Sequence, residues 1–257
     1  MIDIDQVRIS FGGLHALDGV TLQLGDDIEE GAVYGLIGPN GAGKTTLLNA
    51  LTGFVGIDSG RVSIAGVDVT GASVHERARL GVVRSFQTVR LIEDESLEDN
   101  LAIGMYRFRR GRAVAEMLGL ARSQRRHDRK RVADMAATLG FDASDLRRSV
   151  TELPFGLRRM AELGRVILSE PRVALLDEPA AGLEQDQRVQ LADVLRSLAT
   201  DQGVTVILTE HDIEFVRRLC RRIAVLDSGV NIAWGEPATV LAQPDVHRAY
   251  FGESEDV

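Results

Sequence analysis

Several features that mark particular classes of protein are scarce or absent in this sequence of 257 residues. Cysteine occurs once, at Cys220, so no disulfide can form within the chain, and a reducing cytoplasm is the compartment that fits. The longest apolar runs, such as 173–176, fall far short of the roughly 18 to 20 residues that a membrane helix needs. We therefore expect neither a disulfide-stabilised secreted domain nor a membrane-spanning segment.

An excess of positive charge is absent as well. The formal net charge is −8 at pH 7, whereas general affinity for nucleic acid or anionic lipid requires net or clustered cationic charge. We therefore expect no nucleic-acid partner. Residues 107–131 are the local exception, with ten Arg or Lys residues against two acidic ones. We interpret this segment as a solvated helical face, with contact with lipid headgroups or a partner protein as the alternative.

Lysine occurs only twice, and one of the two, Lys44, lies in a glycine-rich stretch. Gly38, Gly43, Lys44 and Thr45 fit the pattern G-x-x-x-x-G-K-[ST] of a phosphate-binding loop. The apolar run 33–37 before the loop predicts a buried strand, and the residues after it predict a helix. The apolar face of that helix would be Leu47, Leu48 and Leu51, and its end would be Gly53.

The chemistry of this loop indicates a nucleoside triphosphate as the ligand. In such a loop the backbone N–H groups of residues 40–45 wrap the β-phosphate, and the positive end of the following helix adds to the attraction. Lys44 would bridge the β- and γ-phosphate oxygens and stabilise the charge that develops there, and Thr45 would ligate Mg²⁺. The glycines let the backbone approach phosphate more closely than any Cβ allows.

Polar residues follow two further predicted strands, 173–176 and 204–208. Asp177 and Glu178 come directly after the first strand, and His211 comes shortly after the second. The carboxyl ends of parallel strands meet at one edge of a sheet, so we expect these side chains beside the phosphate loop. Asp177 suits Mg²⁺, Glu178 would orient or deprotonate the attacking water, and His211 would contact the γ-phosphate. The alternatives are a surface acidic turn and a structural histidine.

The alternation of strands and helices predicts an α/β fold, a parallel sheet flanked by helices. Loosely alternating apolar residues at 2–10 and 20–24 predict an N-terminal antiparallel β subdomain, completed by a strand within 61–69. Helices without intervening strands occupy 96–150 and predict an inserted α-helical subdomain. Phe11, at the end of the first strand, is either a stacking surface for a nucleotide base or an ordinary core phenylalanine.

Together these motifs resemble the nucleotide-binding domain of ABC transporters. GPNGAGKTT, Gln87, the LPFGL turn, LLDEP, AGLE and His211 occur in the order and approximate spacing of that family, and the likeness covers essentially the whole chain. The resemblance implies a P-loop NTPase core and a single ABC ATPase domain over 1–257. The core of that domain would comprise about 1–88 and 158–257, and the inserted helical subdomain about 89–157.

The resemblance also implies ATP and Mg²⁺ as ligands and gives single residues a role. Asp177 would be the Walker B aspartate that ligates Mg²⁺, Glu178 the catalytic glutamate and His211 the switch histidine. Gln87 would contact Mg²⁺ or the attacking water, and Phe11 would stack on adenine. The Walker A loop would consist of Gly38, Pro39, Asn40, Gly41, Ala42, Gly43, Lys44, Thr45 and Thr46.

The signature segment of the family, which meets the ATP held by a partner subunit, departs from its usual LSGGQ. Pro154 stands in place of the serine, Phe155 in place of the first glycine and Leu157 in place of the glutamine. Proline offers neither a hydroxyl nor an N–H, so the site that this chain lends to its partner should be the weaker one. The whole segment would be Leu153, Pro154, Phe155, Gly156 and Leu157.

The resemblance further implies the partners and the place of action. They would be transmembrane permease subunits and a second ATPase subunit, in a homodimer or heterodimer, at the cytoplasmic face of the plasma membrane. GVVRSFQTVRL, LLDEPAAGL and PDVHRAYFG are similar to the ATPase subunits of branched-chain amino acid importers. Two alternatives stay open: a weakly hydrolysing, nucleotide-gated partner subunit, and an ABC ATPase that acts outside transport. ATPases of DNA repair carry long coiled coils, for which this chain has no sustained heptads.

Overall fold

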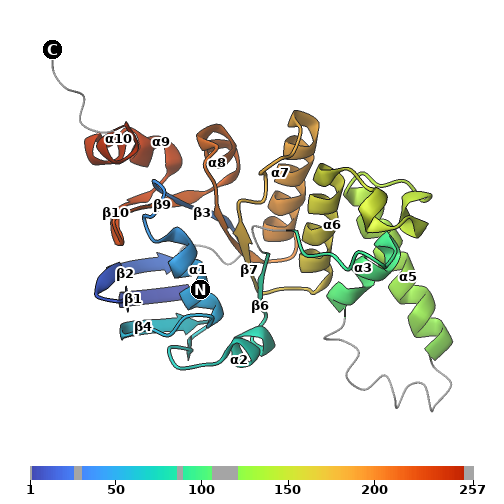
Figure 1. Cartoon of the computed structure of the whole chain (residues 1–257), viewed down its shortest axis with the longest axis horizontal. Coiled ribbons are helices and arrows are strands. Elements are labelled where there is room, and N and C mark those ends of the chain that lie inside the picture. Colours follow the sequence, from blue (N-terminus) through green and yellow to red (C-terminus); the bar gives the residue numbers. More distant parts are fainter. Residues whose placement is uncertain (1, 26–30, 86–88, 106–120, 252–257) are drawn as a thin grey trace. The chain divides into compact units, whose positions relative to one another are not determined.

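The computed structural model describes residues 2–25, 31–85, 89–105 and 121–251, which fall into two compact units (Figure 1). The core unit comprises Met1–Arg84, Arg172–Glu178 and Leu195–Val257, and the helical unit comprises Ser85–Pro171 and Pro179–Val194. The phosphate loop therefore belongs to the core unit and the signature segment to the helical unit. The domain boundaries expected from the sequence stay a prediction.

A four-stranded antiparallel sheet, in the order β2-β1-β4-β5, forms the N-terminal part of the core unit. Alternate side chains of β1, such as Ile2 and Ile4, are fully buried, which confirms the predicted antiparallel subdomain. The predicted strand within 61–69 is instead a hairpin of two strands, because Ala65 and Gly66 adopt positive φ angles of 51° and 76° that turn the chain. The strands are β1 (Ile2–Phe11), β2 (Leu14–Leu24), β4 (Ser59–Ile64) and β5 (Val67–Asp68).

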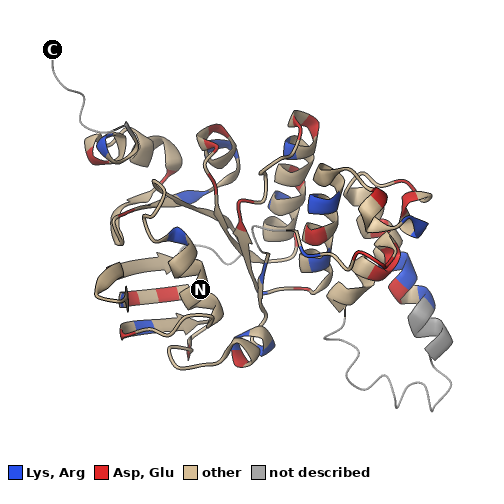
Figure 2. Cartoon of the chain, viewed as in Figure 1, with Lys and Arg blue, Asp and Glu red and all other residues tan. Residues whose placement is uncertain are grey.

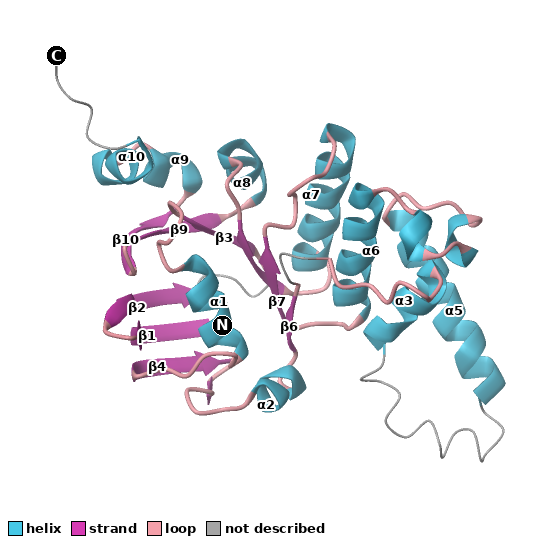
Figure 3. Ribbon diagram, in the orientation of Figure 1, coloured by secondary structure: helices cyan, strands magenta, loops and turns pink. Residues whose placement is uncertain are grey.

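A six-stranded sheet, in the order β10-β9-β3-β8-β7-β6, is the second sheet of the core unit (Figure 3). The strands from β9 to β6 run parallel, and β10 pairs antiparallel with β9. Parallel strands point their carboxyl ends to the same edge, so the residues that follow β3, β7 and β8 gather there. The strands are β3 (Val33–Ile37), β6 (Val82–Arg84), β7 (Val173–Asp177), β8 (Thr205–Thr209), β9 (Arg222–Asp227) and β10 (Val230–Gly235).

Helix α1 (Lys44–Thr52) follows the phosphate loop and packs its apolar face into the hydrophobic core of this unit. Leu47, Leu48 and Leu51 are all at most 1% exposed, as their helical spacing predicts. Gly53 ends the helix in the left-handed conformation, with φ 81°. The other helices that lie wholly in the core unit are α2 (Val74–Arg79), α8 (Ile213–Leu219), α9 (Pro237–Leu241) and α10 (Pro244–Phe251).

The one cysteine is a packed core residue. Cys220 directly follows the last residue of α8. Its side chain is buried, and this burial raises the pKa of the thiol. Across the part of the chain that the structure describes, no helix combines the length and the apolar character needed to cross a membrane.

Helices α3 (Leu97–Ile103), α5 (Ala121–Thr138) and α6 (Phe155–Leu168) pack together in the helical unit. Ser96 caps α3, since its Oγ accepts the Asp99 N–H at 3.1 Å. Gly164 lets the helices approach, because a Cβ there would lie 2.6 Å from Leu139 Cδ1 and 2.7 Å from Leu101 Cδ2. Two short 3₁₀ turns precede α6, and α7 (Gln185–Thr200) runs from this unit into the core unit.

Several positions along the described part of α5 are lysine or arginine, drawn in blue in Figure 2. Arg126, Arg129 and Lys130 are exposed, and Arg129 lies 3.6 Å from Glu98 in an exposed ion pair. Arg131 is partly buried and pairs with Glu170 at 2.5 Å. These residues fit a solvated helical face. Residues 107–120 of the basic segment lie outside the described residues.

Candidate functional site

The phosphate loop runs from the end of β3 to the start of α1 and depends on its glycines. Gly38 and Gly43 have φ angles of 147° and 101°, which favour glycine. A Cβ on Gly38 would lie 2.0 Å from the carbonyl oxygen of Leu226, and one on Gly43 would lie 2.6 Å from that of Ala16. Any side chain at these two positions would therefore displace the neighbouring backbone and distort the loop.

The amino end of α1 is built to receive an anion. Its N-cap is Gly43, which has no side chain, so no side-chain oxygen accepts the first N–H groups of the helix. No acidic residue lies in the first turn. These amides and the helix dipole together attract negative charge. The exposed residues of the stretch are Asn40, Gly41 and Thr45.

Lys44 folds back over the loop. It is 8% exposed, and its Nζ donates to the carbonyl oxygens of Gly38 at 2.6 Å and Pro39 at 2.9 Å. Burial lowers the pKa of the Lys44 ammonium, and the nearby carboxylates of Glu178 and Asp177 oppose that shift. The acids predicted at the sheet edge therefore lie within electrostatic range of the loop lysine.

Asp177, the last residue of β7, is buried and hydrogen-bonded at both carboxylate oxygens. Thr209 donates its hydroxyl to Oδ1 at 2.8 Å, and Arg84 donates from Nη2 to Oδ2 at 3.0 Å. Arg84 also donates from Nη1 to Oδ1 of Asn49 on α1 at 2.5 Å. The bonds from Thr209 and Arg84 fix the orientation of the Asp177 carboxylate at the end of the strand.

Glu178 lies next to His211, as the strand ends predict. Its Oε1 is 2.8 Å from His211 Nε2, and the two side chains are 22% and 47% exposed. The backbone N–H of Glu178 donates both to Thr209 Oγ1 and to the Thr209 carbonyl oxygen, each at 3.1 Å. These bonds hold Glu178 at a φ of 49°, a conformation that non-glycine residues rarely adopt. Such backbone strain is typical of functional sites.

The sequence predicts two further nucleotide contacts, at Phe11 and Gln87. Phe11 ends β1 and is 51% exposed, so it is not a core phenylalanine, and its stacking on a base stays a prediction. Gln87 lies outside the described residues, so its predicted contact with Mg²⁺ or water stays a prediction as well.

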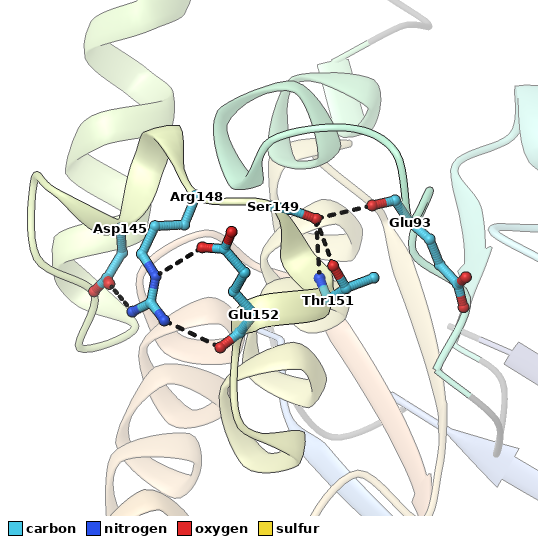
Figure 4. Close-up of polar contacts among 6 residues, drawn as sticks. All are labelled: Glu93, Asp145, Arg148, Ser149, Thr151 and Glu152. Atoms are coloured by element: carbon cyan, nitrogen blue, oxygen red, sulfur yellow. Dashed lines mark hydrogen bonds and ion pairs between the residues drawn. The ribbon is translucent and has the colours of Figure 1, made fainter.

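The signature segment opens α6, and the turn before it is held by polar contacts (Figure 4). Arg148 donates to Asp145 Oδ1 at 2.9 Å and to the Glu152 carbonyl oxygen at 3.0 Å, and Ser149 Oγ donates to the Glu93 carbonyl oxygen at 3.0 Å. The hydrogen bond from Asp142 and the bond with Arg148 lower the pKa of Asp145. The cluster fixes the chain just before Leu153.

Pro154 is the N-cap of α6 and makes no side-chain capping bond. Gly156, expected in the turn, already lies in the first turn of the helix, because α6 begins at Phe155. A Cβ on Gly182 would lie 2.5 Å from the Phe155 ring, and one on Gly156 would lie 2.3 Å from Gln187 Oε1. The AGLE turn at 181–184 therefore packs against the signature segment within the helical unit.

Sequence reasoning missed three residues of the site: Arg84, Asn49 and Thr209. Arg84 is separated from Asp177 by 93 positions, and Thr209 is separated from it by 32, so no local spacing connects them. Thr209 could have been found as the last residue of a buried strand that ends beside Asp177 in the sheet. The signal for Arg84 is weaker: the sequence shows only that it directly follows the apolar pair Val82 and Val83.

Comparisons with known proteins agree with this geometry. The family model described as "ABC transporter" matches residues 22–181. BraF of Pseudomonas aeruginosa, a high-affinity branched-chain amino acid transport ATP-binding protein, is 35% identical over 99% of this chain and 98% of its own length. LivG of Escherichia coli, which has the same description, is 33% identical over the same shares.

A solved structure extends the agreement to the fold. The nucleotide-free ATP-binding cassette of an ABC transporter superposes with a TM-score of 0.81 at 28% identity, covering 98% of this chain and 99% of the other. The predicted α/β cassette fold, with its antiparallel β subdomain, is thereby confirmed. On the match of the family model and of nearly full-length relatives, this chain belongs to the ABC transporter family and is one of its ATP-binding cassettes.

Proposed function

We propose that this chain hydrolyses ATP as the peripheral subunit of an ABC importer for branched-chain or related amino acids. One observation carries the proposal for hydrolysis: Glu178 Oε1 lies 2.8 Å from His211 Nε2, and Glu178 interacts electrostatically with Lys44. A base, its histidine partner and the phosphate-loop cation thus belong to one cluster. The solute class rests on the names of BraF and LivG, which cover the chain almost completely.

The loop residues bind and orient the triphosphate. Amides at the start of α1 donate to its phosphate oxygens, and Lys44, on leaving the carbonyls of Gly38 and Pro39, donates to the β- and γ-phosphates. Glu178 accepts a proton from the attacking water, and His211 and Lys44 stabilise the charge on the γ-phosphate. The loop has no room for a Cβ at Gly38 or Gly43, and this absence of side chains supports the fit to phosphate.

Mg²⁺, when bound, would neutralise phosphate charge during transfer. Thr45 and Asp177 would supply the hydroxyl and carboxylate oxygens that this hard cation prefers, and Gln87 would supply an amide oxygen to Mg²⁺ or contact the attacking water. The exposure of Thr45 and the position of Asp177 as the last residue of β7, in the same unit as the phosphate loop, support the fit.

The partners that we propose are two kinds of protein. A second ATPase subunit would receive the signature segment over its bound ATP, and permease subunits in the membrane would respond to the helical unit. The whole chain, 1–257, would act as one cassette on the cytoplasmic side. The second candidate, a weakly hydrolysing nucleotide-gated subunit, is favoured by Pro154, which caps α6 without a hydroxyl.

The test compares Glu178→Gln with Lys44→Ala. E178Q keeps the phosphate loop, so ATP binding should persist while turnover falls by at least roughly a hundredfold, because the general base is lost. K44A should weaken binding itself, by about 1.5 to 3 kcal/mol for each lost hydrogen bond to phosphate. Nucleotide titration and phosphate release measure the two effects. Retained turnover in E178Q would remove Glu178 from its proposed role.

A further inference from the structure

The guanidinium of Arg84 is buried between two parts of the site that the sequence places far apart. Its side chain is 6% exposed and that of Asp177 is 8% exposed. One terminal nitrogen donates to Asp177 Oδ2 at 3.0 Å, and the other donates to Asn49 Oδ1 at 2.5 Å. A buried charge is tolerated when it is paired and hydrogen-bonded, and both terminal nitrogens of Arg84, the last residue of β6, are hydrogen-bonded.

The second contact of Arg84 leads back to the phosphate loop. Asn49 and Thr45 are four residues apart on α1, which places them one helical turn, about 6 Å, apart along the axis. Arg84 itself is anchored, because β6 pairs with β7 and Arg84 lies opposite Leu175. The bridge Asn49–Arg84–Asp177 thus connects the helix that carries Thr45 with the strand that carries Asp177.

Thr209 completes the arrangement from the other side. Its hydroxyl donates to Asp177 Oδ1 at 2.8 Å, while Arg84 donates to Oδ2. With a donor on each oxygen, the carboxylate plane of Asp177 is fixed between β6 and β8. Partners of this kind, one step removed from a metal, tune affinity by orienting the ligand that they touch.

We propose that Arg84 is a positioning residue of the ATPase: by bridging Asn49 and Asp177, it fixes the Asp177 carboxylate relative to Thr45 for a divalent cation shared with ATP. This inference rests on the proposed function and goes beyond it, since it assigns Arg84 to the metal end of the site. The bridge requires the planar fork of arginine, because two nitrogens donate in two directions.

The experiment measures Mn²⁺ binding by electron paramagnetic resonance in the presence of ATP, on the full chain carrying E178Q so that hydrolysis does not interfere. R84M, R84K and N49A are each added to this parent. R8M serves as the control, because it breaks an exposed ion pair of the same unit, Arg8 with Asp18. Binding of ATP in EDTA and thermal unfolding are measured for every variant.

R84M should weaken Mn²⁺ binding roughly 10- to 100-fold, as loss of an orienting partner typically does, while ATP binding in EDTA stays unchanged. R84K keeps the positive charge but loses one of the two hydrogen bonds of the bridge. N49A loses the hydrogen bond between residues 49 and 84. Both variants should therefore lose less Mn²⁺ affinity than R84M. N49A added to R84M should cause no further loss, since the bridge is already broken. R8M should bind Mn²⁺ like the parent.

The inference is overturned if R84M binds Mn²⁺ as tightly as the parent or more tightly. Equal binding would mean that Arg84 acts only in folding, and tighter binding would mean that its positive charge only repels the cation. Equal losses of Mn²⁺ and ATP binding would overturn it too, since the loop as a whole would be affected. If R84M does not fold, N49A decides by the same criteria. A parent that binds no ATP at all would instead overturn the proposed function, and the inference with it.

Discussion

Glu178 shows how single residues of this cassette are held in place. Its left-handed backbone, with φ 49°, costs roughly 1 to 3 kcal/mol for a non-glycine residue. Two hydrogen bonds from its N–H to Thr209 offset that cost and aim its side chain at His211. The same Thr209 hydroxyl donates to Asp177. One threonine therefore orients both acids of the site.

We expect Thr209→Val to destabilise the chain by about 1 to 3 kcal/mol, because the buried Asp177 oxygen loses its donor while the side-chain volume is kept. Turnover should fall as well, since the backbone N–H of Glu178 loses the Thr209 hydroxyl as an acceptor and keeps the Thr209 carbonyl. Urea denaturation and phosphate release measure these effects. Thr200→Val, at an exposed helix position with a bond to the Arg196 carbonyl, is the matched control. Equal stabilities of T209V and T200V would contradict the assigned role of the hydroxyl.

The phosphate loop, Asp177, Glu178 and His211 could be predicted from the sequence because each follows a short apolar run, and a parallel sheet brings such strand ends together. Arg84 and Asn49 could not, since their contacts join elements far apart in the sequence and no residue type at a fixed spacing announces them. The turn between β4 and β5 was not predicted: Gly66 marks it in the sequence, but nothing in the sequence shows the positive φ of Ala65 beside it.

At the scale of elements, α1 depends on a buried cation at its carboxyl end. Arg77 of α2 is 2% exposed and donates from Nη1 to the carbonyls of Ala50 and Leu51, in the last turn of α1. It also donates from Nε to the Ala72 carbonyl at 3.0 Å. Helix ends leave carbonyls without intrahelical partners, and a cation there also complements the helix dipole. Burial lowers the pKa of Arg77.

Arg77→Met should therefore destabilise the core unit by at least about 2 kcal/mol, because buried carbonyls lose a charged donor. Urea denaturation of the full chain measures the change, and Arg79→Met, an exposed arginine on the same helix, is the control. We expect R79M to stay within about 0.5 kcal/mol of the parent, as surface substitutions usually do. Similar midpoints for R77M and R79M would show that α1 needs no cap from α2.

At the scale of the whole molecule, the phosphate loop lies in one unit, and the signature segment, which departs from the usual LSGGQ, lies in the other. Pro154 caps α6 with no hydroxyl, and the Phe155 ring packs on Gly182 where the usual signature has a glycine. We therefore expect the chain to hydrolyse its own ATP under a partner's signature and to complete the site of a partner less well.

This inequality predicts slow hydrolysis by the chain as a homodimer, in which every site receives the Pro154 segment. Pro154→Ser restores one hydroxyl, worth about 1.5 to 3 kcal/mol as a hydrogen bond to a charged oxygen, and should raise turnover in phosphate release. Serine is also a good N-cap, so Pro154→Ala separates the hydroxyl from the loss of proline. Full-speed hydrolysis by the unmodified homodimer would contradict the predicted inequality.

The burial of Cys220 has a practical consequence. A thiol that is packed in the core and resists ionisation reacts slowly with maleimides, because the thiolate is the reactive form. A cysteine introduced at exposed Asp94 and another at exposed Gln202 would then take up spin labels selectively, without removal of the native cysteine. With one label in each unit, the distance between the two labels can be measured with and without ATP.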